Sequence, residues 1–282
     1  MNKKQSVALS SVFASLLLTV LKLIVGLLTG SMGILSESAH SLLDLGAALI
    51  TFFAVRVGDK VADEDHNYGH QKMESVSALI ETGLLFLTSA WIIYEAIKRL
   101  ATGHIEVEAT WYAFAVMIFS IIVDFSRSRA LSKVARETKS QALEADALHF
   151  SSDILSSITV IVGLIFVSFG VLRADAIAAI GVSLFVLHVG YKLGRRTIDT
   201  LVDTVPAGLP KKIKNLIKKA KGVILIKRIR VRTVGAVIFV EITITVDRNL
   251  SMGQSHAICD EIENKILFSI PEADVTIHTE PN

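Results

Sequence analysis

Long apolar runs, broken by short polar links, fill the first 205 residues. A helix that crosses the hydrocarbon core of a bilayer needs about 20 mostly apolar residues. Six stretches approach or exceed that length, with soft boundaries: 7–28, 32–57, 73–97, 110–125, 141–169 and 175–201. The pattern predicts a six-helix, all-α transmembrane bundle over residues 1–205.

The pattern changes at Pro206. A turn and a basic amphipathic stretch at 206–222 predict a helix. Residues 225–233 and 237–246 alternate apolar with polar side chains, as strands do, and meet near Gly235. A helical stretch at 252–268 and a last strand at 273–280 complete the order α-β-β-α-β. We expect a small cytoplasmic α+β domain over residues 206–282.

Lysine and arginine are unevenly shared between the two sides of the predicted bundle. They gather near the N-terminus and in the links 56–72 and 127–139, whereas the opposite side carries only Lys98, Arg99 and Arg173. Cytoplasmic loops hold the excess of basic residues in membrane proteins. We expect a multi-pass protein with both termini in the cytoplasm, and the short loops favour a bacterial inner membrane.

Composition agrees with a membrane protein and excludes several other classes. The chain is 51% hydrophobic with a mean hydropathy of +0.55, too apolar for an ordinary soluble domain. A net charge of +2 gives no reason to expect nucleic acid as a partner. The single cysteine, Cys259, excludes an intramolecular disulfide and a cysteine-rich metal cluster. The phosphate-binding pattern GxxxxGK[ST] is absent, so an ion gradient is the expected driving force.

Two matched pairs of ionisable residues lie inside the apolar runs. In ESAHSLLD, His40 and Asp44 are four residues apart, and in DALHFSSD so are His149 and Asp153. Each pair shares one helix face, roughly 12–18 Å into the bilayer. Ionisable groups at that depth are costly and usually functional. If the faces meet, two imidazoles and two carboxylates form a set that suits tetrahedral Zn²⁺. The alternative is helix–helix hydrogen bonding or a pore lining without metal.

Other charged residues lie close to these pairs. Glu37 and Asp146 each precede a histidine by three residues and share its face, as outer groups or as part of a vestibule. Lys22, Glu81 and Asp124 are intramembrane charges that we do not place in the site. Lys22 has the length to reach an interface, and Glu81 suits either a dimer surface or a proton path.

The combination of these features resembles the cation diffusion facilitator family over essentially the whole chain. The resemblance rests on the six spans, HSLLD in the second, HFSSD in the fifth, the loop DEDHNYGHQKME and the α-β-β-α-β tail. It implies a homodimeric antiporter that exports divalent metal from the cytoplasm in exchange for protons, by alternating access at the site between the second and fifth spans. His40, where other members have Asp, favours Zn²⁺, while Cd²⁺, Fe²⁺, Co²⁺ and Mn²⁺ stay open.

The resemblance also implies a metal site in the link between the second and third spans. Asp63, His66 and His70 match its ligand positions. The alternative is a solvated polar loop.

A further site is implied in the tail, at the interface between two subunits. Its expected ligands are His256, His278 and Glu280, of which the last two alternate on one strand face. Ile229 and Thr243 stand where fuller versions of this site have histidine, so at most one metal position is expected. The alternative is ordinary surface histidines.

Two other functions compete with transport. A non-transporting metal sensor or scaffold would keep the fold and bind partners through the tail. An intramembrane metallohydrolase would need a general base and usually an HExxH motif, which the chain lacks, so we do not expect an enzyme.

Overall fold

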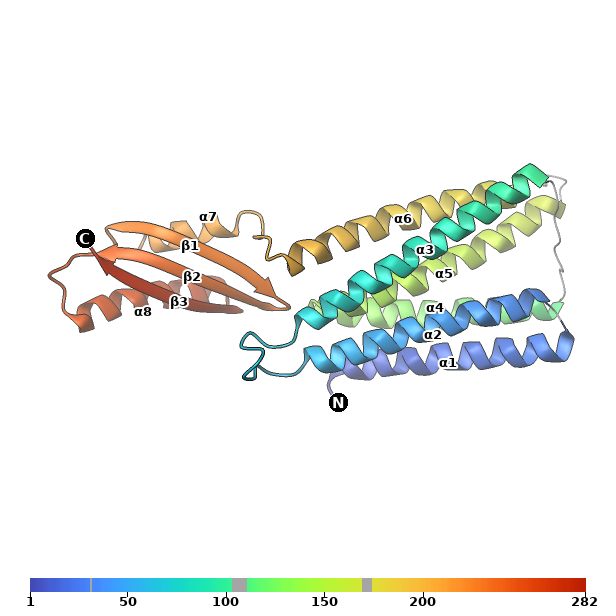
Figure 1. Ribbon diagram of the computed structural model, residues 1–282, viewed down its shortest axis with the longest axis horizontal. Coiled ribbons are helices and arrows are strands. Elements are labelled where there is room, and N and C mark those ends of the chain that lie inside the picture. Colours follow the sequence, from blue (N-terminus) through green and yellow to red (C-terminus); the bar gives the residue numbers. More distant parts are fainter. Residues whose placement is uncertain (31, 103–110, 169–173) are drawn as a thin grey trace. The chain divides into compact units, whose positions relative to one another are not determined.

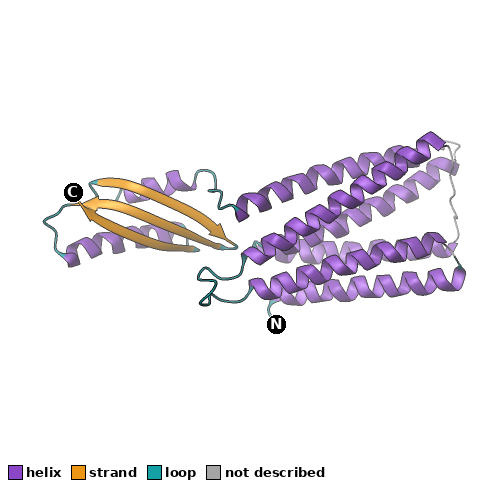
Figure 2. Cartoon of the chain, in the orientation of Figure 1, coloured by secondary structure: helices purple, strands orange, loops and turns teal. Residues whose placement is uncertain are grey.

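The computed structural model describes residues 1–282 except 31, 103–110 and 169–173. The described residues form two compact units, Met1–Ile198 and Asp199–Asn282. All described strands belong to the second unit, whereas the first consists of helices and their links (Figure 2). Three sequence expectations lie outside the described residues: the start of the fourth span, the end of the fifth span, and the basic side chain at 173.

The first unit contains six long helices among its described residues (Figure 1). They are α1 (Lys3–Thr29), α2 (Met32–Gly58), α3 (Lys72–Thr102), α4 (Trp111–Thr138), α5 (Gln141–Ser168) and α6 (Ala174–Leu201). Helix α1 begins after Asn2, whose side chain accepts a hydrogen bond from the Gln5 backbone N–H. Gly30 ends it with a φ of 67°, a left-handed conformation that glycine adopts without strain.

Four of these helices are long and apolar enough to cross a membrane. Within the described residues they are α1, Glu37–Gly58 of α2, Lys72–Lys98 of α3 and Ala176–Leu201 of α6. The prediction of a helical membrane domain is therefore confirmed, but the count of six spans is not. The second half of α4 is rich in charged residues, and α5 carries Glu144, Asp146 and Asp153 in its first half.

Helices α1 and α2 lie side by side, as do α4 and α5, and α5 also contacts α2 and α3. Small residues such as Ala8 and Ala142 are fully buried in one core cluster beside Leu131 and Leu143. Large apolar side chains instead face outward, as at Leu28, which is 82% exposed. Apolar surface turned outward around a close-packed interior suits a protein whose solvent is lipid.

A partly buried ion triad links three helix ends of this unit. The Lys4 ammonium of α1 lies 2.6 Å from Asp59 Oδ1, just after α2, and 2.6 Å from Glu74 Oε1 in the first turn of α3. Asn2 and Gln5 donate further hydrogen bonds to Asp59. Burial by itself raises the pKa of Asp59, but the bonds from Lys4 and Asn2 outweigh it and leave that pKa below its ordinary value.

The second unit confirms the predicted order α-β-β-α-β. Its elements are α7 (Leu209–Ile217), β1 (Leu225–Val234), β2 (Val237–Val246), α8 (Met252–Ser269) and β3 (Ala273–Pro281). The sheet order is β1-β2-β3, with β1 antiparallel to β2 and β2 parallel to β3. Helix α8 is the crossover that a parallel pair requires, and it starts with a capping box between Ser251 and Gln254.

Isoleucine fills the core of the second unit. Ile213 and Ile217 of α7, Ile242 and Ile244 of β2, and Ile262 and Ile266 of α8 are all at most 2% exposed. Helices α7 and α8 contact each other and the sheet, so both cover the same face.

Ile266→Ala is expected to destabilise the second unit by about 2–5 kcal/mol, because it removes a fully buried side chain and leaves a cavity. Hydrogen exchange of the β2 and β3 amides in the full-length protein measures the change. Phe268→Ala on the same helix is the control, because Phe268 is 93% exposed and its loss is expected to change protection little. Equal exchange rates in the two variants would contradict this packing.

Candidate metal centre

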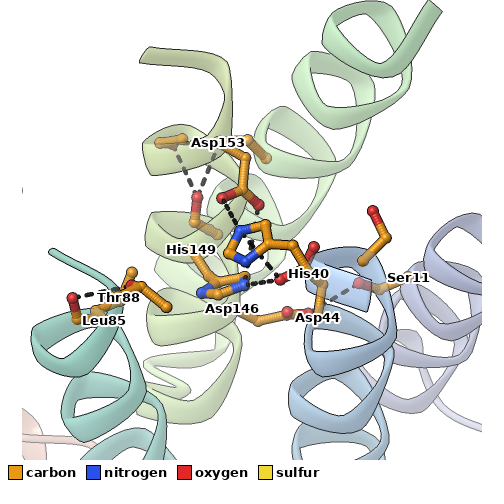
Figure 3. Close-up of polar contacts among 12 residues, drawn as sticks. Ser11, His40, Asp44, Leu85, Thr88, Asp146, His149 and Asp153 are labelled. Atoms are coloured by element: carbon orange, nitrogen blue, oxygen red, sulfur yellow. Dashed lines mark hydrogen bonds and ion pairs between the residues drawn. The ribbon is translucent and has the colours of Figure 1, made fainter. Parts of the chain in front are cut away.

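The two predicted residue pairs converge between α2 and α5. Figure 3 shows His40 and Asp44 from α2 pointing toward His149 and Asp153 from α5. Ligand atoms of Asp44, His149 and Asp153 all lie within 4.8 Å of one another. His40 Nε2 lies 3.8 Å from Asp44 Oδ1 and 3.9 Å from Asp153 Oδ1. The helical spacing thus brings all four side chains together, and their role as metal ligands stays a prediction.

Asp44 and His149 form the closest contact in this group. His149 Nε2 lies 2.8 Å from Asp44 Oδ1, a hydrogen-bonding distance, and 3.9 Å from Asp153 Oδ2. An ionised carboxylate only accepts hydrogen bonds, so a proton lies between the two atoms whichever of them carries it. Both atoms belong to residues of the predicted ligand set.

Exposure differs across the cluster. The side chain of His149 is 5% exposed and that of Asp44 12%, against 21% for Asp153 and 38% for His40. The α5 histidine is therefore the closed side of the site and His40 the more accessible side. His149 Nδ1 is buried without a hydrogen-bond partner among the described residues, so the contact of Nε2 with Asp44 and the packing around the ring orient it.

The two acids that precede the histidines each have a partner outside the cluster. Asp146 is 1% exposed and accepts a hydrogen bond of 3.0 Å from the Ser11 hydroxyl of α1. Glu37 is exposed and lies 3.2 Å from Lys22 Nζ. Lys22 itself is buried at 8% exposure and donates to the Ser41 hydroxyl, so it links α1 to α2 instead of reaching an interface.

Two further acids are buried within the first unit. Glu81 of α3 is fully buried and accepts from the Thr51 hydroxyl of α2, with Ser77 Oγ at 3.4 Å. Asp124 of α4 is 5% exposed. The hydroxyl partners of these buried groups were not predicted, although serine and threonine spaced along apolar runs are a signal for such helix-to-helix bonds.

The link between α2 and α3 forms a second cluster. Asp63 Oδ1 lies 3.1 Å from His66 Nδ1, Asp63 Oδ2 lies 3.4 Å from His70 Nε2, and the imidazole centroids are 4.2 Å apart. The backbone N–H of His66 donates to Asp63, and this bond is the main cause that lowers the pKa of that carboxyl. The three candidate ligand atoms lie within 4.8 Å of one another, as a metal ion requires.

The tail residues are only partly brought together. His278 Nε2 lies 3.8 Å from Glu280 Oε1 on β3, and the Lys227 ammonium, which also bonds Glu280, lowers the pKa of that carboxyl. His256 is instead 3.6 Å from Asp260 on its own helix. Within the part of the tail that the structure describes, no three candidate ligands converge. A site at the subunit interface would need the second copy, so this prediction stays untested.

Comparison with known proteins assigns the chain to a family. The model of the cation efflux transmembrane domain matches residues 8–202, and that of the cation efflux protein cytoplasmic domain matches residues 207–282. The chain belongs to the cation diffusion facilitator family. Members are transporters of divalent metal and not enzymes, and the match to the cytoplasmic dimer domain indicates dimerisation.

Curated relatives cover nearly the whole chain. It is 30% identical over 275 residues to the cation-efflux pump FieF of Cronobacter sakazakii, which covers 97% of this chain and 91% of the relative. It is 29% identical over 283 residues to the FieF pump of Yersinia enterocolitica, with coverages of 98% and 92%. Among solved structures, a MamM CTD variant in its cadmium form is 23% identical and covers 27% of this chain and 96% of its own, at a TM-score of 0.26.

Proposed function

We propose that this facilitator exports Zn²⁺ from the cytoplasm in exchange for protons. It works by alternating access at a His₂Asp₂ site made of His40, Asp44, His149 and Asp153. The transporter is a homodimer of six-span chains with residues 1–205 in the membrane. Both termini and the tail, residues 206–282, are cytoplasmic, in a bacterial inner membrane.

One observation carries this proposal: the hydrogen bond of 2.8 Å between His149 Nε2 and Asp44 Oδ1. This bond holds a proton between two atoms that would otherwise be free to coordinate a metal ion. A ligating imidazole must be neutral and a ligating carboxylate ionised, so metal entry displaces the proton and proton entry displaces the metal. Exchange at one site supports coupled transport by alternating access, with His149 or His40 as the group that carries the exchanged proton.

Two nitrogen and two oxygen donors favour Zn²⁺ among the divalent metals. Zn²⁺ takes imidazole and carboxylate ligands in tetrahedral geometry, whereas Mg²⁺ and Ca²⁺ take six or more oxygens. Cd²⁺, Fe²⁺, Co²⁺ and Mn²⁺ are alternative substrates, since affinity order does not decide the physiological metal.

Proteoliposomes loaded with a zinc dye and a pH dye test the proposal. Zinc entry is expected to be accompanied by opposite proton flow and to stop when an ionophore collapses the proton gradient. Omitting zinc is expected to stop the proton flow. Zinc binding without movement under a proton gradient would favour a metal sensor or scaffold over a transporter. Zinc movement that ignores the gradient would contradict antiport.

A second, separate metal position is proposed at Asp63, His66 and His70. His66→Ala is expected to lower the number of zinc ions bound per chain by one, with a change in transport rate of less than about tenfold. Equilibrium dialysis followed by metal analysis measures the number. Tyr68→Ala is the control, because it alters the same loop without removing a nitrogen or carboxylate donor. Unchanged stoichiometry in the His66 variant would favour a solvated loop without metal.

The tail site of His256, His278 and Glu280 is proposed only for the dimer. Metal bound there would favour the arrangement of the two tails that completes the site, and so report cytoplasmic zinc. Zinc-dependent change in the distance between spin labels on the two tails of a dimer measures this effect.

A further inference from the structure

An open cavity of about 440 Å³ lies between the first turns of α1 and the second half of α4. Its lining includes Lys3, Ser6 and Ser10 from α1 and Arg127, Ala130 and Val134 from α4. No proposed metal ligand lines the cavity. Neither the antiport site nor the loop and tail sites use its residues.

Arg127 is the distinctive group in this lining. Its Nη1 donates to the Ser10 hydroxyl at 2.7 Å and its Nη2 to the Ser126 hydroxyl at 3.2 Å. Among the described residues, no carboxylate lies within 4.0 Å of its guanidinium nitrogens. Guanidinium is always charged and offers five N–H donors in a planar fork that matches phosphate oxygens. A half-buried cation without an anionic partner is suited to an anionic ligand.

Lys3 adds a second positive charge at the rim of the cavity. Its ammonium pairs with Glu137, but the two side chains are 61% and 42% exposed. An exposed pair of this kind contributes little stability, so Lys3 is free to turn toward a stronger anion. The rim thus carries one unpaired and one weakly paired cation.

The α1 face that lines the cavity continues into apolar surface. Ser6, Ser10, Phe13 and Leu17 follow the spacing of one helix face, and Phe13 and Leu17 are 62% and 53% exposed. The same helix is a membrane span by length and hydropathy. Polar and cationic groups at one end of a lipid-exposed apolar stripe match a headgroup with its acyl chains.

We propose that this cavity binds the phosphate of an anionic phospholipid. Arg127 is the main phosphate ligand, the Ser10 and Ser6 hydroxyls and Lys3 surround the headgroup, and the acyl chains lie along Phe13 and Leu17. Basic pockets between membrane helices recognise anionic headgroups in this way. The lipid would brace α1 against α4. The inference rests on the membrane placement of these helices and is independent of which metal is moved.

Thermal unfolding of the full-length protein in mixed micelles tests the proposal. Dioleoyl phosphatidylglycerol is titrated against dioleoyl phosphatidylcholine at constant total lipid, and the shift of the midpoint gives an apparent affinity. The wild type is expected to be stabilised by phosphatidylglycerol only. Arg127→Gln is expected to weaken the apparent affinity by about tenfold or more, because it removes a charge-assisted contact to phosphate.

Arg129→Gln is the matched control, since Arg129 is an exposed residue two positions along α4 and does not line the cavity. It removes the same charge and is expected to leave the phosphatidylglycerol affinity unchanged. Equal weakening in the two variants would overturn the site in favour of a diffuse charge effect. Stabilisation by phosphatidylcholine, or by inorganic phosphate alone, would overturn the anionic lipid. Arg127→Lys keeps the charge but loses the planar set of N–H donors. Its apparent affinity for phosphatidylglycerol is expected to lie between those of the wild type and Arg127→Gln.

Discussion

Asp44→Asn is expected to reduce zinc transport by at least about 100-fold. Asp44 Oδ1 lies close to both histidines of the cluster, at 2.8 Å from His149 Nε2 and 3.8 Å from His40 Nε2. Removal of groups that only orient metal ligands already costs about 10–100-fold in affinity or activity, and this change removes the charge of a proposed ligand. Because asparagine has nearly the same size as aspartate, the loss of transport is due to the missing negative charge and not to a change in packing. Initial rates of zinc uptake into proteoliposomes measure it.

Glu37→Gln is the control for this variant. It removes one negative charge from the same helix, but Glu37 is 63% exposed and contacts Lys22 instead of the cluster. Its uptake rate is expected to stay within about threefold of the wild type, because the Glu37 carboxylate is mostly exposed and exposed charges contribute little. Zinc uptake by the Asp44 variant within tenfold of the wild type would exclude the cluster as the transport site. Proton flux is expected to fall together with zinc flux, since both need the same oxygen.

The positions of His40, Asp44, His149 and Asp153 could be predicted because spacing on a helix is a local property. Residues four apart share a face in any helix, and ionisable groups in a bilayer have few places to go other than the protein interior. The direction of Asp146 could not be predicted in the same way. It shares the face of His149 by spacing, yet its carboxyl meets Ser11, a residue more than a hundred positions away.

The tail domain was predictable for a related reason. Alternation in β1 and β2, the turn at Gly235 and the amphipathic α7 are local signals that all agree with the order α-β-β-α-β. The number of membrane spans was less secure. A hydropathy window averages the apolar character of its side chains. The charged residues of α4 and α5 lower that average, although they lie in the protein interior or at the helix ends. The triad of Lys4 depends on three helix ends meeting, which no local pattern encodes.

Lys4→Met is expected to destabilise the first unit by about 3 kcal/mol. The ammonium lies between Asp59 and Glu74, and the three side chains are only 16%, 15% and 8% exposed. Methionine keeps most of the length of the lysine, so packing changes little, but two neighbouring carboxylates lose their shared cation. Breaking a buried ion pair from one side costs about 3–5 kcal/mol because the remaining charge stays uncompensated. Equilibrium unfolding of the detergent-solubilised full-length protein measures the difference.

Lys3→Met separates this triad from a general effect of positive charge at the N-terminus. Lys3 is the adjacent residue and pairs only with the exposed Glu137, so its loss is expected to cost less than about 1 kcal/mol. The two variants have the same composition and differ only in burial of the missing charge. Equal destabilisation would mean that the triad is no stronger than a surface pair.

The pH dependence gives an independent check on the same triad. The pKa of Asp59 is lowered in the folded protein, so its ionised form contributes stability that is complete above the unfolded value of about 3.9 and is lost as pH falls through the folded value. The gap in stability between wild type and Lys4→Met is therefore expected to be constant from about pH 8 to pH 6 and to narrow below about pH 4. If the stability difference between wild type and Lys4→Met stayed the same below about pH 4, the loss would come from the packing of the lysine side chain and not from its charge. The triad joins the end of α2 to the start of α3. Helix α2 carries His40 and Asp44, and the link between α2 and α3 carries Asp63, His66 and His70. A loss of stability that follows the charge would mean that one ammonium fixes the two helix ends on either side of that link.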